Sequence, residues 1–360
     1  MRDTSSTPDR TDIIRGHSAG ELDLTVIVPA YNEEQSIADT IRSLQQQTLK
    51  PREILVVDDF SSDRTGEIAR ACGATVLRPP RNTGSKAGAQ NFALAHVKTD
   101  LTMAIDADTT LAPDAIEKLL PALQDESVAA ACGFVIPRHV ETLWERGRYV
   151  EYLLAFTWYK PIQDYCDHPL ISSGCFSMYR TKILKENGGW STRTLAEDMD
   201  LTWSFYKRGY KVRFVHDAVC YPIEPHNLFF MRKQLKRWSH GFVQNVTLHW
   251  EDILEIPYLR SFIMVALWDA VLASIAYLIL IPLLAVLFSS PILLVGYIID
   301  IPVLVVPVLY TASRRKETMG ALGSIPSFFV LRTVNSFFLL EALVTELLFG
   351  RSLRTYEKGH

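Results

Sequence analysis

Four groups of acidic and basic-aromatic residues are spaced along the first two thirds of the chain. In order they are Asp58-Asp59, Asp106-Ala107-Asp108, Glu197-Asp198 and Gln234-Leu235-Lys236-Arg237-Trp238. The first two groups each follow a short apolar run, which places their carboxylates at strand ends. Such carboxylates can hold a divalent metal against a diphosphate and can deprotonate an acceptor. One member of the first pair is expected to orient the turn that follows it, and the other to face the crevice.

The Asp106-Ala107-Asp108 motif is the candidate metal site. In an extended segment its two carboxylates would lie on the same side, and a hard cation such as Mg²⁺ or Mn²⁺ takes oxygen ligands of this kind. The motif alone is weak because surface loops often contain it, but here it directly follows the apolar run from Leu101 to Ile105. A metal at this place would neutralise charge that develops on a departing nucleotide diphosphate.

Two later motifs each have a structural and a functional interpretation. Glu197 and Asp198 precede an amphipathic helix, whose first turn favours acidic residues, but Asp198 is equally suited to be a general base for an acceptor hydroxyl. The stretch from Phe229 to Trp250 fits a helix at a membrane interface. In the functional interpretation, Trp238 is a stacking floor for an acceptor sugar and Arg237 a fork for phosphate oxygens.

Three further residues could contact a nucleotide. Tyr31, within the segment Pro29 to Glu33, could stack on a nucleobase, and Asp59 could accept a hydrogen bond from a base N–H. Each of them alone is more often a turn residue. The segment from Arg81 to Gly88 lacks the residue order of a phosphate-binding loop. Lys86 near a helix start could still supply one cation to a diphosphate.

Composition bounds the class of protein. The chain has 360 residues, 37 basic and 40 acidic, with a formal net charge of −3, which argues against a nucleic-acid binder. Its mean hydropathy of +0.08 is high for a soluble enzyme, and the apolar excess lies after about residue 260. The five cysteines are widely spaced without a CxxC pair, so we expect reduced thiols, neither a disulfide framework nor a zinc site.

Strand and helix patterns alternate over the first part of the chain. The patterns predict strands at 25–28, 54–57, 75–77 and 103–105, and helices at 36–47, 63–71, 88–96 and 113–123, with Pro113 in the first turn of the last. This alternation predicts an α/β fold with a mostly parallel sheet and flanking helices, in which ligands bind at the carboxyl ends of strands. Later strands are predicted at 212–215 and 218–221. An aromatic-rich helix at 143–165 is predicted to pack in the core, with contact to lipid headgroups as the alternative.

Past Pro257 the chain becomes strongly apolar. The runs 262–288 and 291–310 each reach the roughly 20 residues that a membrane span needs. The basic loop Arg314–Lys316 is expected in the cytoplasm, so these runs would form a hairpin. A third segment, 328–349, carries polar residues and either spans with its polar face against the other helices or lies in the interface. The first twenty residues lack the apolar core of a signal peptide, and the catalytic part is expected in the cytoplasm.

Taken in this order and spacing, the D, DxD, ED and QxxRW series resembles that of the membrane-embedded family 2 glycosyltransferases, a group that includes cellulose, hyaluronan and poly-N-acetylglucosamine synthases and ceramide glucosyltransferase. The resemblance covers roughly Leu24 to Trp250. It implies a GT-A fold, Mg²⁺ or Mn²⁺, and inverting transfer from a nucleotide sugar, usually a UDP-sugar, to a carbohydrate or lipid acceptor. Ser172–Cys175 matches the stretch that lines the acceptor entrance. By motif position the resemblance implies Asp198 as catalytic base, Tyr31, Glu33, Asp59, Lys86, Asp106 and Arg237 as donor-binding residues, Asp106 and Asp108 as metal ligands, and Glu197, Gln234 and Trp238 as acceptor-binding residues.

The resemblance also predicts the organisation of the chain. We expect a disordered tail at 1–22, a catalytic domain at 23–225, an interfacial helical region with the QxxRW motif at 226–258, two to three membrane helices at 259–350 and a polar tail at 351–360. The protein would then be a multi-pass protein of the cell membrane with its catalytic domain in the cytoplasm.

Two departures from the family pattern are relevant. The base motif reads Ala-Glu-Asp where polymer synthases usually show Thr-Glu-Asp, and the acid is retained. No membrane helix is expected ahead of the catalytic domain, so the protein would form a homo-oligomer, depend on a partner membrane subunit, or add a single sugar to a lipid. Two other classes remain open: a sugar nucleotidyltransferase, which would lack QxxRW and the membrane hairpin, and a membrane-tethered binding protein with an inactive site, which the intact acidic series disfavours.

Overall fold

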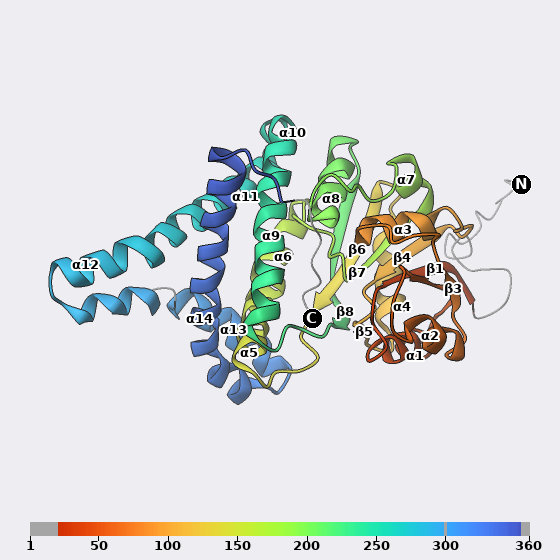
Figure 1. Ribbon diagram of the computed structural model, residues 1–360, viewed down its shortest axis with the longest axis horizontal. Coiled ribbons are helices and arrows are strands. Elements are labelled where there is room, and N and C mark those ends of the chain that lie inside the picture. The colour runs from red at the N-terminus through yellow and green to blue at the C-terminus, as the bar shows by residue number, and fades with distance from the viewer. Residues whose placement is uncertain (1–20, 299–300, 354–360) are drawn as a thin grey trace, which may run out of the picture.

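The computed structural model describes residues 21–298 and 301–353, and the predicted tails at 1–20 and 354–360 lie outside the described residues. A mixed eight-stranded sheet with helices on its faces forms one part of the molecule, and a group of long helices forms the other (Figure 1). The strand order is β3-β2-β1-β4-β7-β6-β8-β5. The predicted α/β architecture with flanking helices is confirmed.

The first half of the sheet is parallel. The central strand β1 pairs in parallel with both β2 and β4, and β3 pairs in parallel with β2. In chain order the elements are β1 (Glu21–Ala30), α1 (Ile37–Gln45), β2 (Lys50–Asp58), α2 (Thr65–Ala71), β3 (Thr75–Leu77), α3 (Lys86–Leu94) and β4 (Leu101–Ile105). All the strands and helices predicted for this part are present. Helix α3 begins two residues earlier than predicted, so Lys86 is its first residue.

The second half of the sheet is mixed, because β7 pairs antiparallel with both β4 and β6, and β5 pairs antiparallel with β8. The elements are β5 (Thr110–Leu111), α4 (Ala115–Leu119), the 3₁₀ turn η2 (Leu120–Leu123), β6 (Val128–Val135), β7 (Phe176–Arg180), α7 (Thr181–Glu186) and β8 (Lys211–Tyr221). The sequence did not predict β5, β6 or β7. The two late strands that it predicted are one continuous β8, and α4 begins at Ala115, after Pro113.

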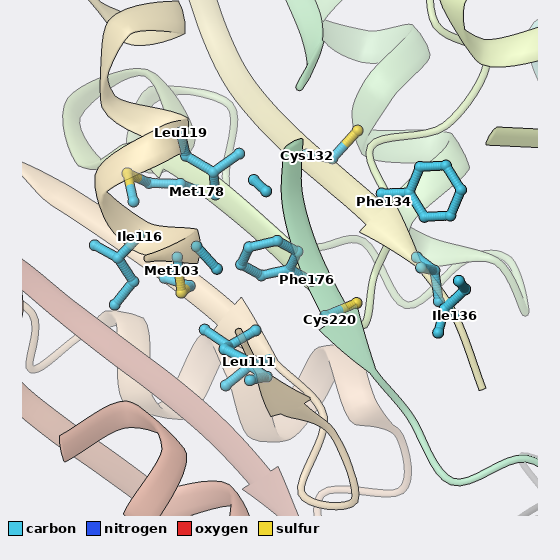
Figure 2. Close-up of a cluster of buried hydrophobic side chains, with 14 of the residues drawn as sticks. Met103, Leu111, Ile116, Leu119, Cys132, Phe134, Ile136, Phe176, Met178 and Cys220 are labelled. Carbon is cyan, nitrogen blue, oxygen red and sulfur yellow. The ribbon is translucent and has the colours of Figure 1, made fainter. Parts of the chain in front are cut away.

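A buried core fixes the strand ends on which the acidic motifs lie. Met103 of β4 and Met178 of β7 pack with Ile116 and Leu119 of α4, and Phe176 lies among them (Figure 2). At Gly133 of β6 an added Cβ would lie 2.3 Å from both the Ala218 carbonyl oxygen and the Phe176 ring. Only glycine therefore lets these strands approach so closely.

The aromatic-rich helix is continuous but carries one π turn. It consists of α5 (Leu143–Leu154), the π turn η3 (Ala155–Tyr159) and α6 (Lys160–Tyr165). A capping box between Thr142 and Glu145 starts it. Tyr149 and Phe156 are buried in the core, as predicted, whereas Trp158 is half exposed.

Two helices lie between the sheet and the apolar segments. The first is α8 (Glu197–Lys207), which precedes β8, and the second is α9 (Leu228–Leu248), which carries the QxxRW motif and is followed by α10 (Trp250–Glu255). The Asn227 side chain caps α9 by accepting from the Phe230 N–H at 3.0 Å. Figure 1 shows α9 between the sheet and the apolar helices that follow it in the chain.

Three helical segments of the described chain are long and apolar enough to cross a membrane. They are Pro257–Leu287, Pro291–Arg314 and Thr318–Leu348. Their elements are α11 (Pro257–Trp268), the π turns η4 (Asp269–Ala273) and η5 (Ala276–Leu280), α12 (Ile281–Leu287), the 3₁₀ turn η6 (Pro291–Ile298), α13 (Ile301–Arg314), α14 (Thr318–Leu343) and the π turn η7 (Val344–Leu348). The hairpin that contains α12 projects away from the sheet, whereas α14 runs beside α9 (Figure 1).

The third apolar segment directs its acidic residues at α9. Lys236 Nζ lies 2.6 Å from Glu341 Oε1, and the buried His240 has its Nδ1 2.7 Å from Glu346 Oε1. This contact matches the alternative in which the polar face of the segment packs against another helix. The helix with the QxxRW motif is thereby fixed to the apolar part of the protein.

Candidate active site

The side chain of Lys86 joins three segments that are far apart in the sequence. Its ammonium group forms an ion pair with the Asp106 carboxylate and donates a hydrogen bond to the Gly174 carbonyl oxygen at 3.0 Å. It also lies 3.7 Å from Glu197 Oε1. The Ser85 hydroxyl caps α3, so the helix N-terminus holds Lys86 at this place. The predicted phosphate, metal and base motifs therefore meet.

Asp198 lies on the other side of the Gly174 loop. Its Oδ2 accepts from the Gly174 N–H at 2.9 Å, and its Oδ1 accepts from the Met199 N–H at 2.9 Å. A Cβ at Gly174 would lie 2.9 Å from Asp198 Oδ2 and 3.2 Å from Lys86 Nζ. Glycine at this position lets the loop pass between a carboxylate and an ammonium group.

Glu197 is the buried member of the acidic pair. Its side chain is only 8% exposed, and this burial raises its pKa. The positive charge of Lys86 offsets part of the rise in pKa, and the negative charge of Asp198 adds to it. Arg237 of α9 lies close enough to act electrostatically on Glu197 in the same direction as Lys86. The QxxRW motif is thus connected to the acidic pair.

Asp106 and Asp108 lie in a turn, and the prediction of an extended segment was wrong. The Thr109 N–H donates to the Asp106 carbonyl at 3.1 Å, which closes the turn directly after β4. The Asp106 carboxylate is 32% exposed, whereas Asp108 is buried and accepts from the Thr109 hydroxyl at 3.1 Å. The Asp108 carbonyl accepts from Arg138 at 3.0 Å. Strand β4 ends here because the Thr109 N–H bonds within the turn and not to a neighbouring strand.

The two carboxylates fit a divalent cation that also takes phosphate oxygens. Within residues 21–298 and 301–353, no three or more His, Cys, Asp or Glu side chains are grouped to hold a metal. Mg²⁺ is usually held by one or two carboxylates together with substrate phosphates. The Asp106 carboxylate already pairs with one cation, the ammonium group of Lys86, so its position suits a positively charged partner.

Asp58 performs one of the two tasks that the sequence predicted for the pair, and Asp59 holds a neighbouring loop. Asp58 is buried, accepts from the Ser61 N–H at 2.9 Å and pairs with Arg78 at 2.7 Å. It therefore orients the turn, as predicted for one of the two residues. Asp59 accepts from the N–H and the hydroxyl of Thr83, both at 2.8 Å. These bonds fix the loop that leads into α3.

Tyr31 and Glu33 follow β1 at the same edge of the sheet. The Asp59 N–H donates to the Ala30 carbonyl at 2.8 Å, so the chain after β1 leaves beside Asp59. The Tyr31 ring is 46% exposed. Glu33 is buried at the start of α1, where its carboxylate accepts from the Ser36 hydroxyl at 2.8 Å. Tyr31 is thus about half exposed, whereas Glu33 shapes the loop that follows it.

A buried arginine that the sequence analysis missed holds the QxxRW motif. Arg148 of α5 is 1% exposed and donates to Gln234 Oε1 at 2.7 Å. Its guanidinium lies 4.5 Å from the centre of the Trp238 ring. Glu224 lies 3.4 Å from Arg148 Nε and accepts from Gln234 Nε2 at 3.3 Å. The sequence offered one signal of this role: Arg148 lies four positions before Tyr152, so both fall on one face of the predicted helix.

Helix α9 packs against the start of α8 through residues that follow the QxxRW motif. A Cβ at Gly241 would lie 2.7 Å from the Ala196 Cβ. The Asn245 side chain donates to the Ala196 carbonyl at 3.1 Å, and Gln244 accepts from the Leu195 N–H at 3.0 Å. The predicted acceptor and base residues therefore belong to adjacent elements.

Asp200 anchors α8 and explains part of the acidic pattern. It is fully buried, and its two oxygens accept from Arg193 at 2.8 and 2.6 Å. His249 Nε2 lies 2.7 Å from Asp200 Oδ1. Burial alone would raise the pKa of Asp200, but the hydrogen bonds from Arg193 and His249 outweigh it and lower the pKa to about 2. Asp200 is therefore a structural carboxylate.

The comparison with protein families decides the class of this site. The model described as "Glycosyl transferase family 2" matches residues 25–188, a stretch that contains Asp59, Lys86, Asp106 and Asp108. Residues 25–188 thus match a family 2 glycosyltransferase domain. The matched stretch contains most of the residues predicted to bind the donor, while the Glu197-Asp198 and QxxRW motifs follow it.

Two curated relatives agree with the family. The poly-beta-1,6-N-acetyl-D-glucosamine synthase of Staphylococcus aureus is 25% identical over 222 residues, and the probable glycosyltransferase YdaM of Bacillus subtilis is 31% identical over 230 residues. Both alignments cover 61% of this chain and 54% of the relative, so the chain spans about half the length of these proteins. Both matches agree with the family match over residues 25–188.

One solved structure shows the same fold. It is the mannosyltransferase PcManGT from Pyrobaculum calidifontis in complex with GDP-Man and Mn²⁺. Its TM-score is 0.61 at 20% identity, over 90% of this chain and 87% of that chain. The predicted GT-A fold followed by apolar C-terminal helices is confirmed.

Proposed function

We propose that this glycosyltransferase moves a sugar, with inversion, from a nucleotide donor to a hydroxyl of a growing polysaccharide or a lipid-linked acceptor. A UDP-sugar is the proposed donor. The observation that carries the proposal is the convergence of Asp106, Lys86 and Asp198 around Gly174. This arrangement places a cation for a diphosphate within one loop of a carboxylate that can take a proton.

The donor end of the site is formed by the edge of the parallel strands. We assign the nucleobase to Tyr31, whose exposed ring can stack on it, and to Asp59, with Glu33 shaping the loop. Lys86 would leave Asp106 to pair with the diphosphate, aided by the N-terminus of α3. Asp106 and Asp108 would hold Mg²⁺ or Mn²⁺, which would neutralise charge on the leaving diphosphate.

The acceptor end is formed by α8 and α9. Asp198 would take the proton of the acceptor hydroxyl as it attacks the sugar C1 on the side opposite the diphosphate. The Gly174 N–H holds one oxygen of this carboxylate in place. Glu197, Gln234 and Trp238 would line the acceptor path. Arg237 would offer its guanidinium fork to phosphate oxygens.

We further propose that the apolar segments anchor the protein in the cell membrane with the catalytic domain, residues 23–225, on the cytoplasmic face. Residues 226–258 would lie at the interface and residues 259–350 in the bilayer. The basic loop 314–316 between the last two spans supports this orientation. The α12 hairpin projects away from the rest of the protein (Figure 1). This projection supports a homo-oligomer or a partner membrane subunit that covers the hairpin.

Transfer of a single sugar to a membrane lipid is the second candidate. The observation that favours it is the arrangement of the apolar segments in the described part of the chain. The third packs on both α5 and α9, the second packs on α5, and the hairpin with α12 projects away, so the spans lie on one side of the sheet (Figure 1). A lipid acceptor would reach the site from the membrane side of α9. The S. aureus relative, named as a polysaccharide synthase, supports polymer formation.

A donor screen tests the proposal. Purified protein in detergent is incubated with a panel of UDP-sugars and with GDP-mannose, with and without Mn²⁺, and nucleotide release is measured. Release of UDP with one sugar, dependent on the metal, is expected. Product size with the labelled donor then separates a polymer from a single addition. Absence of release with every donor, in lipid nanodiscs as well as in detergent, would refute sugar transfer.

A further inference from the structure

A buried lysine supports the loop that holds Asp198. Lys160 is the first residue of α6 and is 9% exposed. Its ammonium donates to the Ser173 hydroxyl at 2.7 Å and to the Ile171 carbonyl at 2.9 Å. It also lies 3.5 Å from the Cys132 sulfur. All three partners are neutral.

The loop that Lys160 holds is bonded to α8 at two points. The Ser172 N–H donates to the Thr202 hydroxyl at 2.9 Å, and the Gly174 N–H donates to Asp198 Oδ2 at 2.9 Å. Thr202 in turn donates to the Asp198 carbonyl at 2.7 Å. A shift of this loop would therefore move the Asp198 side chain directly.

A buried ammonium without a carboxylate partner is unfavourable, because neutral hydrogen bonds replace only part of its hydration. The rings of Phe156 and Phe214, whose centres lie 4.8 and 5.7 Å from the Lys160 Nζ, offset a further part of this cost. Within the described chain no carboxylate lies within ion-pair distance of Lys160. The charge of Lys160 acts on Asp164, but this carboxylate is bonded to Arg213 and to the Phe214 N–H. An aliphatic side chain would fill this space at lower cost. Lysine here indicates a requirement other than stability.

The π turn ahead of Lys160 determines which face it occupies. Arg148 and Lys160 are twelve residues apart, which in a regular α-helix would place them about 120° apart around the axis. The π turn Ala155–Tyr159 takes up about one extra residue, so both side chains fall on one face. Arg148 holds Gln234, and Lys160 holds the Gly174 loop, so one helix supports both sides of the acceptor region.

We propose that Lys160 is a positioning residue for sugar transfer: it holds the 171–174 loop so that Gly174 fixes the Asp198 carboxylate toward the acceptor. This inference rests on the proposed function. Lys160 acts through the loop, so it affects the rate of transfer more than the binding of the donor, to which the loop is connected by the bond between Lys86 and the Gly174 carbonyl.

The test compares five variants of the full-length protein, four single substitutions and the double variant Lys160→Met/Ser173→Ala. Lys160→Met removes the ammonium and keeps the length of the side chain, Lys160→Arg restores the charge, and Ser173→Ala removes one partner of the lysine. Lys185→Met is the matched control, since Lys185 donates to the Val97 carbonyl at 2.6 Å outside the site. The measurements are kcat with the active donor, binding of UDP with Mn²⁺ by calorimetry, and hydrogen exchange of the peptide that contains Gly174.

Lys160→Met is expected to lower kcat by about 100-fold, because misplacement by about 1 Å costs this much. UDP binding should stay within about twofold of the wild type, and the Gly174 peptide should exchange faster. Lys160→Arg should recover part of kcat, and Ser173→Ala should add little to Lys160→Met because both changes break one contact. Lys185→Met should leave every measurement unchanged.

Two results overturn the inference. Unchanged exchange of the Gly174 peptide in Lys160→Met shows that the lysine does not hold the loop, and this readout does not need an active enzyme. A fall in UDP binding that matches the fall in kcat shows a general structural role. If the wild type transfers no sugar while Lys160→Met still loosens the loop, sugar transfer is refuted and the support of the loop by Lys160 stands.

Discussion

Gly174→Ala tests the geometry of the site with a single methyl group. An ordinary contact of a Cβ begins at about 3.4 Å, whereas this Cβ would lie 2.9 Å from Asp198 Oδ2 and 3.2 Å from Lys86 Nζ. The Asp198 carboxylate must therefore move by about half an ångström, and Lys86 by less. Both contacts involve the ends of side chains, so the fold should tolerate the change with a loss of about 1 kcal/mol or less.

The expected catalytic effect follows from this displacement. A misplacement of about 1 Å can cost about 100-fold in rate, so a shift of half that size should lower kcat about tenfold. The nucleotide-release assay gives kcat, and calorimetry with UDP and Mn²⁺ gives the donor affinity. Gly320→Ala in α14 is the matched control, because its Cβ would meet nothing within 4 Å.

One result would refute this reasoning. A folded Gly174→Ala protein with the kcat and the UDP affinity of the wild type would show that the Asp198 and Lys86 side chains do not need the positions they have beside this loop. The convergence that supports sugar transfer would then have no catalytic meaning. A loss of kcat in Gly320→Ala as well would show instead that the assay reports on the stability of the protein.

Four further predictions follow from named contacts. Asp198→Asn should abolish transfer and keep UDP binding, and loss of UDP binding in a folded protein would remove the base assignment. Asp108→Ala should raise the Mn²⁺ concentration needed for activity or eliminate activity, and an unchanged Mn²⁺ titration would exclude Asp108 as a ligand. Arg148→Met should lower the free energy of unfolding by about 3–5 kcal/mol, because Glu224 would keep a buried charge without its partner; thermal unfolding in detergent measures this, and a loss below 1 kcal/mol would contradict it. Asp200 has a pKa of about 2 against an ordinary 3.8, so its stabilisation of about 2 kcal/mol should be present above about pH 3.8 and lost as the pH falls toward 2, and Asp200→Asn should remove this acid dependence.

The parallel half of the fold was predictable because its strands and helices alternate with clear sequence periods. Ile37, Ile41 and Leu44 mark one helix face and are all fully buried. The antiparallel half was not predictable in the same way. Strand β6, Val128–Val135, is buried along its whole length, so it shows no alternation, and its many alanines also suit a helix. Its pairing with β7 joins residues that are 45 to 49 positions apart in the sequence.

The site was predictable to the extent that motifs follow strand ends or open helices. Asp106 and Asp198 were recognised this way, and the structure brings both to Lys86 and Gly174. Arg148 and Lys160 were not recognised, because a lone basic residue in a helix is usually at the surface. Their burial depends on tertiary packing and, for Lys160, on a π turn that local sequence does not indicate.

The helix that carries these two buried cations also connects the site with the apolar part of the protein. At Gly147 of α5 an added Cβ would lie 2.8 Å from the Ser327 carbonyl oxygen of α14, so the two backbones are in close contact. Arg148, the next residue, lies about 100° further round the helix and holds Gln234. A shift of α14 relative to the sheet should therefore move the residues proposed to line the acceptor path. With an acceptor that arrives from a membrane, as proposed, this coupling would give the third apolar segment a part in positioning the acceptor site as well as in anchoring the enzyme.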